Sequence, residues 1–153
     1  MALPLVALRS VEVKQFVSLN APLTKREDAG GGVAGLQPHI ESWETFKLHR
    51  NSDNTVSFES SQFKNVFLRL DGNGVAKGEL IPAGGGIVNG QFGSYSYEKF
   101  KIHRKEGPQQ KFAGIVGVES NQFPGRFLRC SPGKVNVQGV MKTNEEFELI
   151  FVV

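Results

Sequence analysis

The sequence repeats itself, imperfectly, along most of its length. Segments 56–69 and 116–129 share the pattern V-x-Φ-E-S-x-Q-F-x-x-x-F-L-R, in which Φ is an apolar residue. A weaker copy lies near the start, at 6–10 and 16–19. In each copy, apolar residues alternate with others up to a polar turn, and a second short segment follows. Because alternation with period two is typical of half-buried strands, each copy predicts a β-hairpin.

A second element also recurs. It reads WETFKLH at 43–49, YEKFKIH at 97–103 and NEEFELI at 144–150. Each segment is predicted to form a strand with apolar side chains on one face and Lys, Glu and His side chains on the other. The apolar positions are Phe46, Leu48, Phe100, Ile102, Phe147 and Leu149.

Three units of this kind predict the fold. Each unit alone would expose an apolar face, and packing the three around one axis buries a common core with few free edges. We therefore predict an all-β protein, a β-trefoil, with three pseudo-repeats around a small six-stranded barrel closed by hairpins. The chain is predicted to be a single domain over residues 1–153, with lobes at approximately 6–54, 55–114 and 115–153. A seven-stranded sandwich does not predict a threefold repeat.

Two glycine runs, Gly30–Gly32 and Gly84–Gly86, interrupt the pattern. They lie in Gly-rich insertions at 29–35 and 83–93, and we expect flexible loops there. A phosphate-binding loop would need a strand before and a helix after the glycines, and no segment shows helical periodicity.

Charge and hydropathy exclude several classes of protein. The formal net charge is +3, and no block of like charges marks a nucleic-acid partner. No stretch approaches the roughly 18 apolar residues of a membrane span, and the N-terminus lacks the features of a signal peptide. We expect a cytoplasmic protein, and export without a cleaved signal stays open.

Cys130 is the single cysteine, so no internal disulfide is predicted. It follows the F-L-R motif at a place that Leu19 and Leu70 hold in the other repeats. We therefore expect a small buried core residue and not a reactive thiol.

No residue pattern indicates catalysis. Glu59 and Glu119 resemble a glycosidase pair in type, but they are repeat positions in different lobes. We expect each glutamate to stabilise its hairpin by cross-strand pairing. The histidines have long, irregular spacings, so neither a metal site nor a cofactor is predicted. The protein is expected not to be an enzyme.

The turns that follow the F-L-R motifs are candidates for ligand binding. Their short polar side chains could bond to sugar hydroxyls, and a nearby tyrosine could offer a stacking face. The predicted ligand-binding residues are Asp71, Asn73, Tyr95, Tyr97 and Lys134. The same turns could be hairpin connections only, which D-G-N-G favours by itself.

Two equivalent strips of basic residues suggest a different partner, one that is acidic or sulfated. The strips comprise Lys47, His49 and Arg50 in the first lobe, and Lys101, His103, Arg104 and Lys105 in the second. The alternative interpretation is that they are ordinary solvated strand faces.

The segment Trp43–Phe46 resembles the W-E-x-F strand of the fascin-like branch of the β-trefoil superfamily, which includes actin-crosslinking fascins. The polar turn 50–54 and the segments 56–60 and 67–69 follow in the order that fascin lobes show. A weaker resemblance links Leu3–Ser10 to the opening of the amaranthin-type agglutinin domain. The Q-x-W motif of ricin-type lectin trefoils is missing from the sequence.

Two functions therefore stay open for a chain that binds without catalysing. The first is a lectin whose partner is a carbohydrate, although the sequence is poor in Trp and Tyr. The second, implied by the fascin resemblance, is a cytoskeletal module that binds actin filaments. Bundling of filaments by one trefoil would need two sites or self-association, so a homodimer also stays open.

Overall fold

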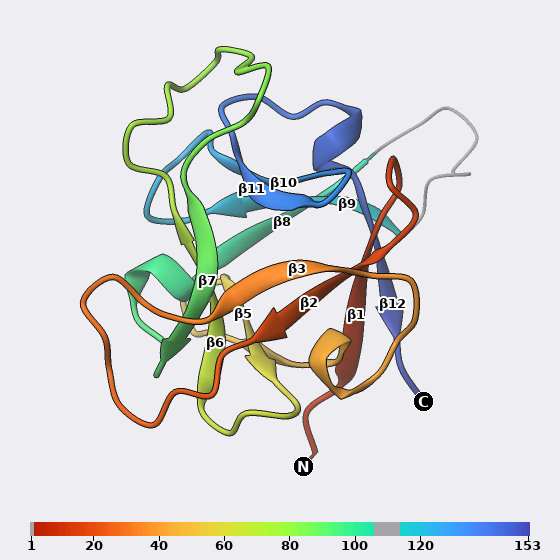
Figure 1. Cartoon of the computed structure of the whole chain (residues 1–153), viewed down its shortest axis with the longest axis vertical. Coiled ribbons are helices and arrows are strands. Elements are labelled where there is room, and N and C mark those ends of the chain that lie inside the picture. Colours follow the sequence, from red (N-terminus) through yellow and green to blue (C-terminus); the bar gives the residue numbers. More distant parts are fainter. Residues whose placement is uncertain (1, 106–113) are drawn as a thin grey trace.

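The structure is a computed structural model that describes residues 2–105 and 114–153. Over these residues the chain forms twelve strands and three short 3-10 helices (Figure 1). The elements are β1 (Leu5–Ser10), β2 (Phe16–Asn20), β3 (Val33–Gln37), η1 (Ser42–Glu44), β4 (Phe46–Arg50), β5 (Val56–Ser60), β6 (Val66–Asp71), β7 (Ile87–Phe92), η2 (Ser96–Glu98), β8 (Phe100–Arg104), β9 (Ile115–Ser120), β10 (Phe127–Ser131), β11 (Lys134–Gln138), η3 (Thr143–Glu145) and β12 (Phe147–Phe151).

Six of the strands close into a barrel. Antiparallel pairing runs from β1 to β4, β5, β8, β9 and β12, and then from β12 back to β1. The other six strands form three hairpins, β2–β3, β6–β7 and β10–β11, whose second strands contact one another. The prediction of a six-stranded barrel closed by hairpins is therefore confirmed. We refer to β1–β4, β5–β8 and β9–β12 as lobes one, two and three.

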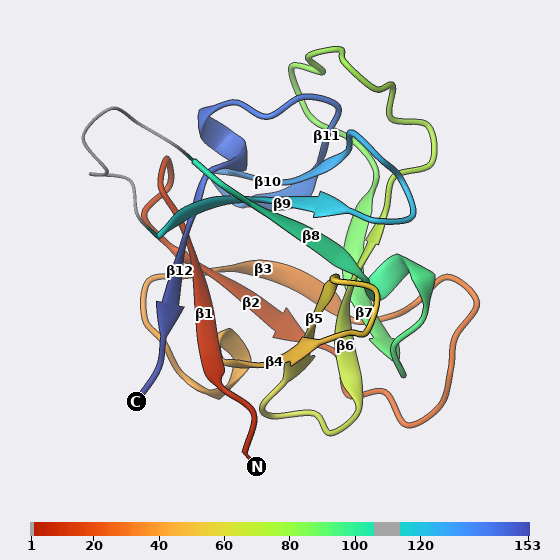
Figure 2. The same cartoon turned by 180° about the vertical axis from the view of Figure 1, so that it is seen from behind.

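The two ends of the chain meet where the barrel closes. Strand β1 pairs with β12 from Val6 opposite Phe151 to Ser10 opposite Phe147. The Val152 amide then donates to the Leu5 carbonyl at 2.8 Å. Figures 1 and 2 show the two ends close together beneath these strands. No described helix has the length and apolar character that crossing a membrane requires.

Aromatic side chains from all three lobes fill the barrel. Phe46, Phe58, Phe100 and Phe147 are fully buried. The Phe58 ring lies 6.2 Å from the Phe46 ring, edge to face, and 5.8 Å from the Phe100 ring. Burial of one such side chain contributes about 1.5–3 kcal/mol. The predicted apolar strand face is confirmed, and so is the burial of Cys130 in the same core.

The start of the second repeated element differs from its prediction. Residues 43–45 are predicted to be strand, but Ser42–Glu44 forms the 3-10 helix η1 and the strand begins at Phe46. The cause is the glutamate that ends each helix, because its carboxylate turns back to a backbone amide. Glu44 accepts from the Glu41 amide at 2.9 Å, and the same bond recurs from Tyr95 to Glu98 and from Lys142 to Glu145.

The glycine runs also differ from their prediction as flexible loops. The connections are residues 21–32 and 72–86, and the later parts of the predicted insertions are strands β3 and β7. Gly31 forms a two-bond backbone bridge with Gly90, and Gly85 forms one with Val137. Each Gly-rich connection is therefore held against the following lobe by backbone hydrogen bonds.

Candidate functional site

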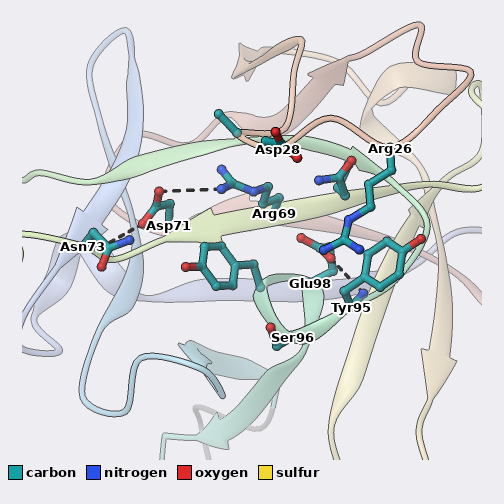
Figure 3. A pocket seen from close by; sticks show the side chains of 11 residues that line it. Arg26, Asp28, Arg69, Asp71, Asn73, Tyr95, Ser96 and Glu98 are labelled. Carbon is teal, nitrogen blue, oxygen red and sulfur yellow. Dashed lines mark hydrogen bonds and ion pairs between the residues drawn. The ribbon is translucent and has the colours of Figure 1, made fainter.

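Lobe two carries a polar pocket of about 380 Å³, at the edge of the β6–β7 hairpin. Its walls come from the end of β6 and the turn after it, from the segment around η2, and from the loop 21–32 of lobe one (Figure 3). The lining residues are Arg26, Asp28, Ala29, Arg69, Asp71, Asn73, Gln91, Tyr95, Ser96, Tyr97 and Glu98.

The structure brings together most of the predicted ligand-binding residues. Asp71, Asn73, Tyr95 and Tyr97 all line this pocket, although the tyrosines lie far from the aspartate in sequence. Lys134 begins strand β11 and is not among the lining residues. The predicted set therefore divides into four residues at one pocket and one residue elsewhere.

Arg69 forms the floor of the pocket and is only 4% exposed. Its Nη1 donates to Asn89 Oδ1 at 3.3 Å, and its Nη2 lies 3.6 Å from Asp71 Oδ2. The guanidinium also lies 4.9 Å from the centre of the Tyr97 ring. A guanidinium held by an amide, a carboxylate and a ring is fixed in orientation, which is what recognition of a small polar ligand requires.

The turn after β6 fixes the position of Asp71. The Asn73 amide donates to Asp71 Oδ1 at 3.0 Å, which forms an Asx turn. The other carboxylate oxygen faces Arg69. The exposed Asn73 side chain lies at the rim of the pocket, where Figure 3 shows it beside Asp71.

The segment around η2 supplies the opposite wall. Glu98 is 1% exposed, and its Oε1 accepts from the Tyr95 amide at 2.8 Å. Burial raises the pKa of the Glu98 carboxyl, and the Tyr95 amide, Arg69 and Arg26 only partly oppose this rise. Figure 3 shows the Arg26 side chain reaching across the Tyr95 ring, and its guanidinium carbon lies 4.1 Å from the ring centre.

The pocket thus presents fixed donors, acceptors and aromatic rings without a large net charge. Its lining holds two arginines, Arg26 and Arg69, and three carboxyl groups, those of Asp28, Asp71 and Glu98. Each tyrosine ring already has a guanidinium over one face, so the predicted stacking surface is smaller than the sequence suggested. Across residues 2–105 and 114–153, no group of three or more His, Cys, Asp and Glu side chains is arranged to hold a metal ion.

The sequence pattern does not identify the buried residues that form the base of this pocket. Arg69 and Glu98 lie at repeat positions, and the sequence pattern assigns a role to neither. A signal was present, because the arginine of F-L-R recurs as Arg129 and the glutamate recurs as Glu145. In lobe three the two form a buried ion pair, with Arg129 Nε 3.9 Å from Glu145 Oε2, whereas the ion pair of Arg69 in lobe two is with Asp71.

The predicted basic strips lie on the outside of the barrel and are interrupted by carboxylates. Lys47 lies opposite Glu59 across the β4–β5 pair, and His49 Nε2 is 2.7 Å from Glu59 Oε1. In the second strip, Lys101 and His103 meet Glu119 in the same way. Arg50 and Arg104 are exposed at the strand ends, and Lys105 forms an ion pair with Glu146 at 2.5 Å.

The two glutamates have the hairpin role predicted for them. Glu59 Oε2 accepts from the Asn65 amide at 2.8 Å, and Glu119 Oε2 accepts from the Gly125 amide at 2.7 Å. Each carboxylate therefore joins the strand that carries it to the turn that follows and to a histidine on the neighbouring strand. These contacts agree with the predicted hairpin role, and its contribution to stability stays a prediction.

No protein-family model matches the chain, and no curated protein sequence matches it. Several solved structures do. SeviL, solved bound to the asialo-GM1 saccharide, aligns with 99% of both chains at a TM-score of 0.67 and 11% identity. The designed threefold-symmetric protein ThreeFoil aligns with 97% of this chain and 99% of its own at a TM-score of 0.73 and 10% identity. The chain is a β-trefoil.

A further match to this β-trefoil is the Macrolepiota procera ricin B-like lectin in complex with lactose. It covers 98% of this chain and 96% of the lectin, with a TM-score of 0.66 and 12% identity. Similarity at this level of identity shows the fold alone. It does not single out the fascin-like branch that the sequence resembles.

Proposed function

We propose that this β-trefoil is a glycan-binding module and that the lobe-two pocket is its binding site. The observation that carries the proposal is the convergence of Asp71, Asn73, Tyr95 and Tyr97 around the buried Arg69. Sugar hydroxyls are recognised by fixed polar groups next to aromatic surface, and binding sites of this kind are concave and largely preformed. The pocket has these properties.

The charges of the pocket indicate the class of glycan. The two arginines are matched by carboxyl groups, and Arg69 already contacts Asp71. A sulfated or otherwise strongly anionic sugar would have to displace these internal pairs. We therefore propose a neutral glycan, whose hydroxyl groups both donate to carboxylates and accept from guanidinium and amide groups.

The fold comparisons support the proposal only in a general way. SeviL and the Macrolepiota procera lectin were each solved with a sugar bound, which shows that related scaffolds carry such sites. A fold does not define a function, so the argument depends on the pocket itself. We propose binding without catalysis, because the pocket carboxyl groups of Asp71 and Glu98 are already engaged by Arg69 and by the Tyr95 amide. No observation on the described residues favours actin binding.

A glycan array tests the proposal. Labelled protein is applied at about 150 mM salt, where exposed charges are screened beyond roughly 8 Å. We expect binding to neutral glycans that share a terminal sugar, a clear loss with Asn73→Ala, and no loss with the matched surface change Lys134→Ala. A blank array would overturn the proposal and make co-sedimentation with actin filaments the next experiment. Binding confined to sulfated chains would point instead to the basic strips.

A further inference from the structure

The two Gly-rich connections carry the same short sequence and dock in the same way. Residues 27–32 read E-D-A-G-G-G, and residues 81–86 read I-P-A-G-G-G. The first residue of each motif is clamped by a glutamine of the next lobe. Gln91 Nε2 donates to the Glu27 carbonyl at 2.6 Å and its Oε1 accepts from the Glu27 amide at 3.0 Å. Gln138 holds both backbone groups of Ile81 at 2.7 Å.

A second contact fixes the other end of each motif. Its middle glycine pairs with the strand of the next lobe: Gly31 with Gly90 and Gly85 with Val137, through two backbone hydrogen bonds each. Between these two contacts each motif makes a β-turn, in which the Gly30 amide donates to the Glu27 carbonyl at 3.2 Å and the Gly84 amide to the Ile81 carbonyl at 2.8 Å. Each docked segment is therefore a turn that is recognised through its backbone.

Lobe one has the receiving elements, and no segment among the described residues docks on them. The connection from β10 to β11 consists of Pro132 and Gly133 alone. It is therefore too short to dock on lobe one as the longer connections dock on their neighbouring lobes. The position equivalent to Gln91 and Gln138 is Gln37, by its register opposite Phe16, and its side chain is exposed. The next residue inward, Leu36, corresponds to Gly90 and Val137, and no bridge to it forms among the described residues.

A cavity of about 320 Å³ lies at this place. It is lined by Gln37, His39, Glu41, Ser42, Trp43 and Glu44. Gly35 stands where Asn89 and Asn136 stand in the other lobes, so lobe one has no asparagine side chain at this position. A Cβ atom on Gly35 would have no neighbour within 4 Å.

The charge of the groove differs from that of the other two lobes. In each of those lobes the arginine of the F-L-R motif acts electrostatically on a buried glutamate. Arg129 forms an ion pair with Glu145, and Arg69, without a direct ion pair, partly opposes the burial that raises the pKa of Glu98. In lobe one that arginine is replaced by Ser18, while Glu44 stays buried at 3% exposure. The groove therefore has a buried glutamate without the arginine that accompanies its counterparts in the other two lobes.

The loop of lobe one that docks on lobe two shows where a basic side chain would lie relative to the clamp. Arg26 immediately precedes the clamped Glu27 and lies over Tyr95, the residue just before η2. The residue in the same place before η1 is Glu41, which is exposed. By analogy, a segment docked on lobe one could carry a basic residue immediately before the residue that Gln37 holds. That basic side chain would lie next to Glu41 and Glu44.

We propose that the open groove of lobe one binds a peptide segment of a partner protein that forms the same turn, held by Gln37 and by the Leu36 backbone, with a basic side chain opposite Glu41 and Glu44. An Ala-Gly-Gly-Gly run begins two positions after the clamped residue, as in the two docked loops. This peptide site is separate from the glycan pocket of lobe two, so either proposal can fail without the other.

The test uses the full chain labelled with ¹⁵N and the peptide acetyl-Arg-Ile-Pro-Ala-Gly-Gly-Gly-amide, which follows the docked motif of residues 81–86 with an added arginine. We expect its titration to shift the amide signals of β3 and the indole signal of Trp43. Gln37→Ala should weaken binding about tenfold, since two hydrogen bonds to the peptide backbone are lost. Replacement of the peptide arginine by glutamate should weaken it about fivefold or more.

A second peptide keeps the test independent of changes to the protein. N-methylation of its middle glycine removes the amide that would donate to Leu36, and we expect binding to be lost. No shift at millimolar peptide, shifts outside lobe one, or equal binding of the N-methylated peptide would overturn the proposal. A concentration-dependent dimer that Gln37→Ala abolishes would also overturn it, because the groove would then be occupied by a second copy.

Discussion

The Gln138 carboxamide holds Ile81 by both of its backbone groups, donating to the carbonyl and accepting from the amide at 2.7 Å each. Gln138 belongs to lobe three and Ile81 to the long connection of lobe two. Gln91 makes the same pair of bonds to Glu27 of lobe one. The three repeats are thus joined outside the barrel as well as inside it. Over residues 2–105 and 114–153, no such glutamine clamp joins lobe three to lobe one.

Removal of this clamp should destabilise the protein measurably. Gln138 is 1% exposed, so Gln138→Ala leaves the Ile81 amide and carbonyl without their partners. We expect the free energy of unfolding to fall by about 2–3 kcal/mol, measured by urea denaturation. The matched change Gln37→Ala removes an exposed amide and should cost less than about 0.5 kcal/mol. Equal losses in the two variants would contradict the assigned role of Gln138.

The docking of residues 81–86 on lobe three also depends on the backbone conformation of a glycine. Gly84 has a φ of +66°, and a Cβ atom there would lie 2.6 Å from Asn136 Oδ1. Gly84→Ala should therefore lower the free energy of unfolding by about 1–3 kcal/mol. Gly35→Ala is the control, because its Cβ would meet nothing within 4 Å. If thermal unfolding shows Gly84→Ala to be as stable as the control, the loop is not held as described.

The repeat letters predicted the barrel because its core positions alternate with a period of two. Phe46, Phe100 and Phe147 could be placed in the core for this reason, and all three are buried. The predicted turn at Asp71 and Asn73 and the two tyrosines do line one pocket. Alternation of apolar and polar residues does not show which polar side chains are buried. Glu98 and Arg69 are two such buried polar side chains.

The docked loops were missed for a different physical reason. A glycine run has no side chains whose pattern can be read, and its backbone partners lie in another lobe. A usable signal was present in pairs of motifs. The motif A-G-G-G occurs at 29–32 and 83–86, and V-N-x-Q occurs at 88–91 and 135–138. The first motif is the docked segment, and the second is the strand that receives it.

The carboxylates of Glu59 and Glu119 should make the fold sensitive to acid. Burial by itself would raise the pKa of each, but the amides of Asn65 and Gly125 and the histidines His49 and His103 hold both below the ordinary 4.5. A folded pKa below the unfolded value means that these groups stabilise the fold above pH 4.5. That stabilisation is lost as the pH falls through the folded pKa.

The double variant Glu59→Gln, Glu119→Gln should therefore show a shallower loss of stability in acid. The measurement is the free energy of unfolding in urea from about pH 6 to about pH 3, compared with the wild type. Glu12→Gln, a change at an exposed glutamate, is the control and should keep the wild-type slope. An unchanged slope in the double variant would show that the two carboxylates do not carry the acid sensitivity.

Cys130 should be inert in the folded protein. Its side chain is fully buried, and burial raises the pKa of its thiol to about 12. Because the thiolate is the reactive form, we expect almost no labelling by a thiol reagent at about pH 8 in native buffer. Complete labelling should follow in denaturant. Fast labelling of the native protein would contradict the buried placement.

The most direct test of the glycan proposal is a titration followed residue by residue. The ¹⁵N-labelled chain is titrated with lactose and with the neutral glycan that the array selects, and the amide signals are followed at about 150 mM salt. We predict saturable shifts of Asp71, Asn73 and the segment 95–98, which Asn73→Ala weakens and Lys134→Ala leaves unchanged. Saturable binding that shifts other amide signals, with those of Asp71, Asn73 and the segment 95–98 unchanged, would contradict the lobe-two site.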